Sequence, residues 1–197
     1  LIGGYMEKKK IAVLASLVLV FVVIGLIVVL NLKGSGSTST IKTESDMKKA
    51  FKKIYSDLKD DLPSLETSSI SVSDKDMVKA FTGLSSNDDI EVLVVSEPLM
   101  NAQAYSALMV KVKDGKNVEK VKQEMLDNMD MRKWVCVSAS KLYITNNGNV
   151  IFAIMSSDDW AKPVYDGFKK YVNNDIGKEL EKTGEDDVEL PPEMKVE

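Results

Sequence analysis

Histidine and cysteine most often carry the general-base, nucleophilic and metal-binding chemistry of proteins near pH 7, and this chain of 197 residues has no histidine and one cysteine, Cys136. Without histidine there is no Ser-His-Asp or Cys-His arrangement and no imidazole to bind a metal. One cysteine cannot form a disulfide within the chain. Because Cys136 stands between Val135 and Val137, we predict a small buried apolar residue; a reactive thiol would need a pKa lowered by Lys133 or Arg132.

Two short motifs match those of serine acyl-transfer enzymes of the cell wall, namely Ser138-x-x-Lys141 and Lys182-Thr-Gly184. In those enzymes the serine opens a helix, whereas Ser138 leads into a predicted strand. The S-x-x-K spacing also occurs at Ser45 and Ser56, as expected of a chain rich in serine and lysine. We therefore interpret both motifs as coincidental, and we predict no catalytic residue and no cofactor.

Adjacent carboxylates occur at Asp60-Asp61, Asp88-Asp89 and Asp158-Asp159. Such pairs can share a proton or bind calcium. Each pair lies at a predicted helix end or turn, where solvated acidic residues are common, and the sequence lacks the spacing of an EF-hand loop. The sequence therefore predicts no metal site.

Two features are candidates for binding. Arg132, the only arginine, stands next but one to Trp134, and a guanidinium beside an indole can hold a carboxylate and stack on a ring. The alternative is that Trp134 fills the core while Arg132 pairs with a surface acid. The apolar run Pro98-Leu99-Met100 is the second candidate, as a contact surface, although we expect it to pack against the domain.

Hydrophobic periodicity indicates the elements that position these residues. Apolar residues recur at helical spacing, and Thr43 with Asp46 can form a capping box that begins the first helix. Residues rich in Val and Ile predict strands, two of them joined by a turn at Asn146-Asn-Gly-Asn149. The predicted helices span residues 43–62, 74–82, 117–129 and 157–171, and the predicted strands span residues 90–96, 105–113, 141–145 and 150–155.

This order predicts an α+β fold: an N-terminal transmembrane helix, then one small domain over residues 43–173. The domain has an antiparallel sheet of about four strands with helices mostly on one face. Residues 174–197 are polar, acidic and contain Pro191-Pro192, so we expect a disordered acidic tail.

Residues 11–30 contain no charge, and at about 1.5 Å per residue they could cross the roughly 30 Å hydrocarbon core of a bilayer. Because Lys8, Lys9 and Lys10 precede this run, we predict a cytoplasmic N-terminus (residues 1–10), a signal-anchor that contacts the lipid bilayer (residues 11–32) and a flexible linker (residues 33–42). The domain would then lie outside the cell membrane of a bacterium. A cleaved signal peptide is the alternative, but the run is too long for one.

The charge balance argues against some partners. The chain has a formal net charge of −4, and the part beyond the predicted span is more acidic still, since three of the lysines precede that span. Nucleic acid and anionic lipid are therefore poor partners.

Three stretches carry a resemblance to a known family: Glu91-Val-Leu-Val-Val-Ser-Glu-Pro-Leu-Met-Asn-Ala102, Met109-Val-Lys-Val-Lys-Asp-Gly-Lys-Asn-Val-Glu-Lys-Val-Lys122 and Gly148-Asn-Val-Ile-Phe-Ala-Ile-Met-Ser-Ser157. They resemble the exported, often lipidated clostridial domains called domain of unknown function four-three-five-eight. The resemblance implies a Firmicutes envelope protein and no known activity. The chain departs from the family at Ser106 and Asn128, where the family has an acidic residue and an arginine.

These observations favour a non-enzymatic interaction or scaffold module of the cell envelope, with an envelope protein as its partner. The alternative is a binding domain for a small solute or a cell-wall fragment. That alternative would need a concave pocket lined by Trp134, Tyr143 or Trp160, whereas a broad exposed apolar patch around Leu99 and Met100 would favour the interaction module.

Overall fold

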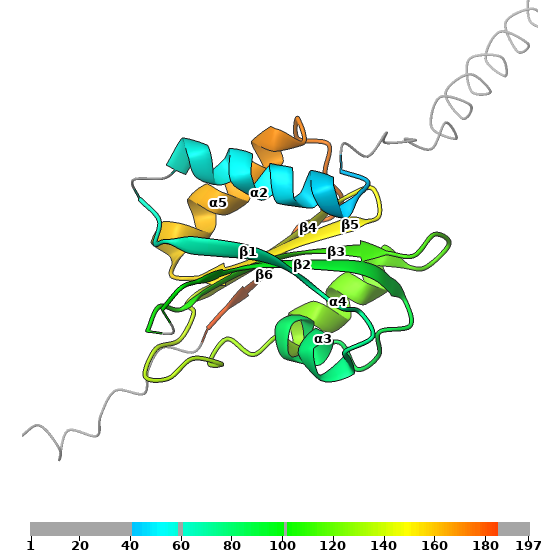
Figure 1. The fold of residues 1–197 in the computed structure, drawn as a ribbon, viewed down its shortest axis with the longest axis horizontal. Coiled ribbons are helices and arrows are strands. Elements are labelled where there is room, and N and C mark those ends of the chain that lie inside the picture. Colours follow the sequence, from blue (N-terminus) through cyan, green and yellow to red (C-terminus); the bar gives the residue numbers. More distant parts are fainter. Residues whose placement is uncertain (1–40, 59–60, 101, 185–197) are drawn as a thin grey trace, which may run out of the picture. The chain divides into compact units, whose positions relative to one another are not determined.

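The computed structural model of the chain describes residues 41–58, 61–100 and 102–184. In them a six-stranded antiparallel sheet lies between two pairs of helices, so the fold has three layers (Figure 1). The strand order is β1-β2-β3-β5-β4-β6. The strands are β1 (Leu65–Ile70), β2 (Ile90–Pro98), β3 (Tyr105–Val112), β4 (Lys141–Asn147), β5 (Val150–Ser156) and β6 (Leu180–Thr183); the helices are α2 (Glu44–Leu58), α3 (Lys75–Thr82), α4 (Val118–Asn128) and α5 (Asp158–Tyr171).

Local signals begin and end most of the helices. The predicted capping box before α2 is confirmed, because the Asp46 amide donates to Thr43 Oγ1 and the Thr43 amide donates to Asp46 Oδ2. Asn117 caps α4 and Asp74 caps α3. Ser157 occupies the N-cap position of α5 and makes no side-chain cap bond.

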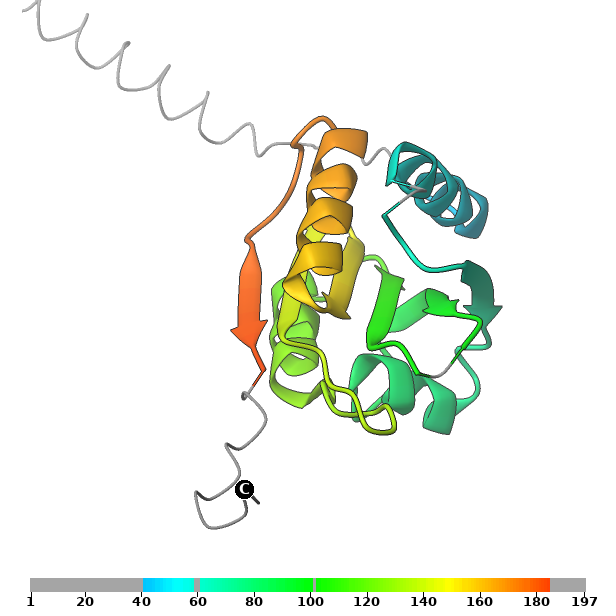
Figure 2. The ribbon, with the colours of Figure 1, turned by 90° about the vertical axis from the view of Figure 1, so that its left-hand side faces the viewer.

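The sheet is covered on both faces, which explains why its central strands are apolar at nearly every position. Along β3, Ala107 and Met109 belong to the core beneath α2 and α5, while Leu108 and Val110 belong to the core beneath α3 and α4. Every residue of β5 is buried. The domain therefore has two apolar layers, one on each side of the sheet (Figure 2).

The α+β class and the antiparallel sheet are confirmed, but the prediction of about four strands is wrong. Two edge strands were missed, β1 and β6, and both are largely polar. Because β6 pairs with β4 from Leu180 to Thr183, residues 174–184 belong to the domain and not to the predicted tail. At the other end Ile41, assigned to the linker, is fully buried.

The helices do not gather on one face as predicted, because two crossover connections run on opposite sides of the sheet. β3 connects through α4 to β4, and β5 lies between these strands; β5 connects through α5 to β6, and β4 lies between them. Both units are split β-α-β arrangements. α4 covers one face and α5, with α2, covers the other (Figure 1).

No helix among residues 41–58, 61–100 and 102–184 is long and apolar enough to cross a membrane. The predicted span at residues 11–32 and the cytoplasmic segment 1–10 lie outside the described residues, as does 185–197. These assignments stay predictions.

Candidate functional site

Three polar side chains meet at one end of β2 and β3. Lys133 Nζ lies 2.7 Å from Glu97 Oε1 and 3.0 Å from Ser106 Oγ, and Ser106 Oγ donates to Glu97 Oε1 at 2.5 Å. The Lys133 and Glu97 side chains retain 18% and 30% of their exposure, whereas Ser106 is fully buried. We call Glu97, Ser106 and Lys133 the polar cluster.

The direction of the hydrogen bonds in the polar cluster decides what chemistry it can do. A serine activated by lysine must pass its proton to a neutral amine. Here the Ser106 proton points to Glu97, and the lysine donates to the serine oxygen instead. In this arrangement the Lys133 amine donates to both Glu97 and Ser106 and does not accept the serine proton. The arrangement therefore holds parts of the chain together and does not activate a nucleophile.

What the polar cluster holds is the loop of residues 129–140 between α4 and β4. Besides its two hydrogen bonds, Lys133 Nζ lies 4.8 Å from the ring centroid of Phe81 on α3 and 5.2 Å from that of Trp134. The base of the loop is closed by a hydrogen bond from the Ala139 amide to the Met131 carbonyl, at 2.8 Å, and both residues are buried. The loop is thus fixed at its base and at Lys133.

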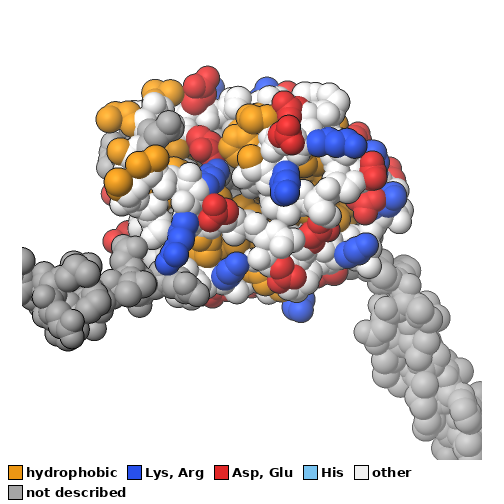
Figure 3. All heavy atoms as spheres, turned by 90° about the horizontal axis from the view of Figure 1, so that it is seen from below, with side chains coloured by type: hydrophobic (Ala, Val, Ile, Leu, Met, Phe, Trp, Pro, Cys, Tyr) orange, Lys and Arg blue, Asp and Glu red, His pale blue; other side chains and the backbone are white. Residues whose placement is uncertain are grey.

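Beyond these fixed points the loop exposes apolar side chains. Val135 is 77% exposed and Val137 37%, and in the neighbouring β2–β3 connection Leu99 is 65% and Met100 69% exposed. Both loops lie at the same end of the molecule (Figures 1 and 2), and apolar side chains gather at that end of the surface (Figure 3). We call Leu99, Met100, Val135 and Val137 the loop patch. The prediction that Leu99 and Met100 pack against the domain is wrong.

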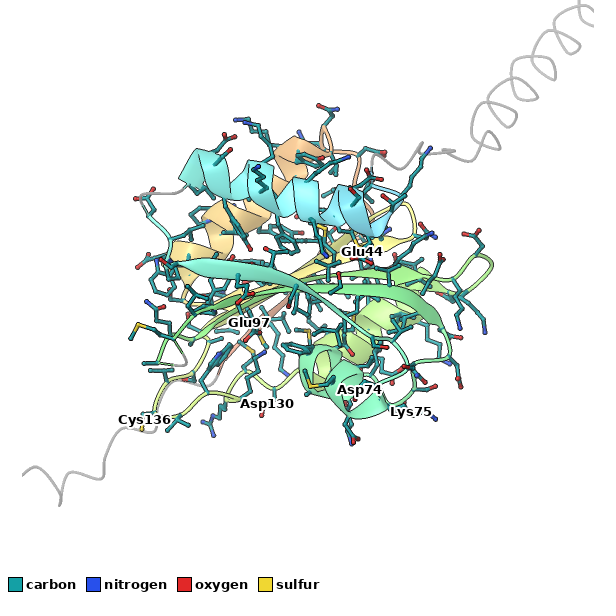
Figure 4. All side chains as sticks on the ribbon, viewed as in Figure 1. Glu44, Asp74, Lys75, Glu97, Asp130 and Cys136 are labelled. Carbon is teal, nitrogen blue, oxygen red and sulfur yellow. The ribbon has the colours of Figure 1, made fainter. Side chains whose placement is uncertain are left out.

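Cys136 lies between the two valines of the loop patch and is exposed, so the prediction of a buried cysteine is also wrong (Figure 4). Its backbone adopts a φ of 64°, a left-handed conformation that is rare for residues other than glycine. The chain bends at residues 134–136. The run Val-Cys-Val is therefore part of an exposed loop and not the buried apolar segment that the sequence predicted.

The two residues predicted to bind lie on different parts of the loop surface. Arg132 lines a cleft of about 290 Å³ together with Ser138, Lys182 and Gly184. Trp134 is half-buried, packs on the core beneath α3 and α4, and has Lys133 over its ring.

The remaining motif residues have structural partners. Lys141, from the Ser-x-x-Lys motif, pairs with Glu181 at 2.5 Å, and the pKa of Lys141 is raised mainly by that hydrogen bond. Lys182 Nζ lies 3.3 Å from the Leu126 carbonyl. Each of these lysines therefore has a structural partner in the fold.

Two of the acidic pairs also have partners in the fold. Asp89 pairs with Lys116 at 2.7 Å, which lowers the pKa of the carboxyl. Asp158 accepts a hydrogen bond from the Tyr143 hydroxyl at 2.7 Å, and the pKa of Tyr143 is raised by burial and by this carboxylate. Within the described parts of the chain, no group of three acidic or cysteine side chains could hold a metal ion.

Glu97, Ser106 and Lys133 were not recognised as a cluster from the sequence. Only the register of β2 against β3, which places Ser96 opposite Ala107, brings Glu97 beside Ser106. The one signal available was Lys133 next to Trp134, just before the apolar run at residues 135–137. Ser106 thus lies between the two charged side chains of the polar cluster.

The fold and site together define a three-layer α+β domain with an exposed apolar loop patch. Comparison with protein-family models, with curated proteins and with solved structures finds no match for this chain. The resemblance to the clostridial family therefore stays a prediction.

Proposed function

We propose that the domain is a non-enzymatic interaction module of the bacterial cell envelope, and that the loop patch is its contact surface for an envelope protein. The observation that carries the proposal is the exposure of four large apolar side chains on two neighbouring loops. Exposed apolar surface of this kind costs solubility, and a partner that covers it removes that cost.

The contacts that hold the two loops to the domain support the same function. A contact surface that is already ordered loses little conformational entropy on binding. Lys133 connects the loop to β2, β3 and α3, and the Leu99 amide donates to the Ser64 carbonyl at 3.1 Å. The two loops therefore present their side chains from a fixed framework.

Site-specific photocrosslinking in native membranes tests the proposal. A photoreactive residue at Val135 should give a discrete crosslinked product, and one at the exposed Lys49 of α2 should not. The double substitution Leu99→Ser/Met100→Ser should abolish the product, whereas Met77→Ser, which removes an exposed methionine outside the two loops, should leave it unchanged. Equal crosslinking from Val135 and Lys49 would overturn the proposal.

The alternative function, a binder of a small solute, required a pocket lined by Trp134, Tyr143 or Trp160. Tyr143 lines a cleft of about 240 Å³, but most of the other residues that line it are charged, and Lys169 and Glu179 among them form an ion pair. The expected aromatic pocket therefore has little support at these residues.

A further inference from the structure

A groove between α2 and α5 is separate from the loop patch. Its volume is about 490 Å³, within the usual range of ligand sites of roughly 300–1,000 Å³. Its floor is apolar and its rims are charged. The floor residues are Ile54, Leu58, Pro163, Gly167 and Tyr171, and the rim residues are Lys53, Asp57, Asp166 and Lys170.

The closest approach of the two helices limits the groove. Gly167 has no side chain, and a Cβ atom there would lie 2.9 Å from Ile54 Cγ2. The helices therefore touch at this point, while Leu58, Pro163 and Tyr171 leave open space beside the contact. The space is shaped by packed backbone and by half-buried side chains and not by a mobile loop.

The rims carry two positive and two negative side chains, and both signs occur on each helix. Lys53 Nζ lies 2.7 Å from Asp57 Oδ1 along α2, and Lys170 Nζ lies 3.9 Å from Asp57 Oδ2 across the groove. Asp166 pairs with Lys162 on α5. These side chains are between about 40% and 80% exposed. Exposed ion pairs contribute little to stability, so a ligand can replace them at little cost.

We propose that the α2–α5 groove binds a short peptide with free termini and aliphatic side chains. Lys53 and Lys170 can hold the carboxylate, Asp57 and Asp166 can hold the ammonium, and the floor covers the side chains. The four rim charges sum to zero, so a ligand that carries both charges keeps the groove neutral, whereas an anion or a cation alone would give it a net charge. The groove volume of about 490 Å³ lies in the lower half of the usual range of ligand sites, which suits a ligand of the size of a dipeptide.

The experiment titrates the full chain in detergent with leucyl-leucine and follows the backbone amide resonances by NMR. Resonances of residues that line the groove should shift and saturate, and N-acetyl-leucyl-leucine amide, which has the same side chains without charges, should bind at least about tenfold more weakly, a difference of about 1.4 kcal/mol. The proposal would be overturned if no resonance shifted up to about 10 mM peptide, because a dissociation constant above that concentration means under about 3 kcal/mol of binding. Equal binding of the neutral compound would also overturn it.

Substitutions on the rim test separately how the groove binds the carboxylate and the ammonium of the peptide. Lys53→Gln/Lys170→Gln should weaken leucyl-leucine about tenfold, whereas Lys48→Gln, which removes a lysine of α2 that pairs with Glu44, should not. In Asp57→Asn/Asp166→Asn, leucyl-leucine and N-acetyl-leucyl-leucine should bind equally. An equal loss in the Lys48 variant would overturn the assignment of the rim.

Because no residue of the loop patch lines this groove, failure here leaves the proposed contact function untouched, and the crosslinking experiment tests that function separately.

Discussion

Lys122 of α4 is a lysine with a fully buried side chain. Its ammonium lies 2.6 Å from Asn146 Oδ1, 2.7 Å from the Lys178 carbonyl and 2.8 Å from Glu119 Oε1, so all three of its protons have acceptors. It links the helix to β4 and to the segment that leads into β6. Burial of this charge is tolerated because these acceptors replace water.

We expect Lys122→Met to lower the free energy of unfolding by about 2 kcal/mol, because it leaves the Asn146 and Lys178 acceptors without a donor while Met fills the volume. Urea denaturation measures the change. Hydrogen exchange should also show faster exchange in β6. Lys120→Met, on the exposed side of the same helix, should stay within about 0.5 kcal/mol of the parent; an equal loss in both variants would contradict a special role for Lys122.

Protonation of the Glu179 carboxyl should make the stability of the domain depend on pH. Its pKa lies below the ordinary value of 4.5, first because of the hydrogen bond from Lys169 and then because of that from the Tyr165 hydroxyl. A lower pKa in the folded state means that the unfolded chain binds the proton first, so the stabilisation is present above the unfolded pKa and is lost as pH falls through the folded one. Glu179→Gln should therefore reduce stability at pH 7, and the difference should shrink towards pH 3. A difference that is the same at both values, or that matches Glu66→Gln, would contradict this cause.

At the scale of the elements, the close packing of α5 against α2 requires a residue without a side chain at position 167. Gly167→Ala should improve helix propensity by up to about 1 kcal/mol, but the new methyl group would overlap Ile54 Cγ2. We expect a net loss of about 1–2 kcal/mol. In an Ile54→Ala background, where that atom is missing, the same substitution should stabilise. A double-mutant cycle by thermal or urea unfolding measures the coupling, and additive effects would mean that the helices simply move apart.

The C-terminal strand β6 should be part of the folding unit. A chain that ends after Asn173 loses β6 and the Lys178 carbonyl that Lys122 needs, so it should be less stable by about 3 kcal/mol or more. A chain that ends after Gly184 should melt as the full chain does. If the shorter chain kept the parent melting temperature, β6 would be an accessory strand.

The elements that the sequence revealed are those with a strong apolar pattern: α2 has apolar residues at helical spacing, and β5 is a continuous apolar run between two packed layers. β1 and β6 escaped because Ser68 and Ser69, or Glu181 and Lys182, carry no alternating pattern; these strands are held by backbone pairing to one neighbour, which a sequence pattern does not record. The loop patch was misjudged for a related reason. Whether Val-Cys-Val is buried or exposed depends on how the loop is held, and that depends on contacts of Lys133 with distant residues.

For the whole molecule, the predicted anchor at residues 11–30 leads to an expectation about topology. Protease added to intact protoplasts should degrade the domain and leave a small fragment in the membrane, because the lysines before the apolar run keep the N-terminus inside. Immunodetection with an epitope on either end distinguishes the products. Survival of an intact domain under conditions that digest a control surface protein would reverse the predicted orientation.

The position of β5 has a consequence for how the chain reaches its native state. β3 and β4 precede β5 in the chain, yet β5 lies between them and pairs with both. The tight turn at Gly148 and Asn149 lets β4 and β5 form a hairpin from local contacts, which takes about 1–10 μs in small hairpins. Docking of that hairpin onto β3 then closes a long stretch of chain that includes α4, and the entropy of this closure makes it the slower event. Until it occurs, the edge of β3 from Ala107 to Val110 stays open to other chains, so the rate of this one step sets how long a newly made molecule is prone to aggregate.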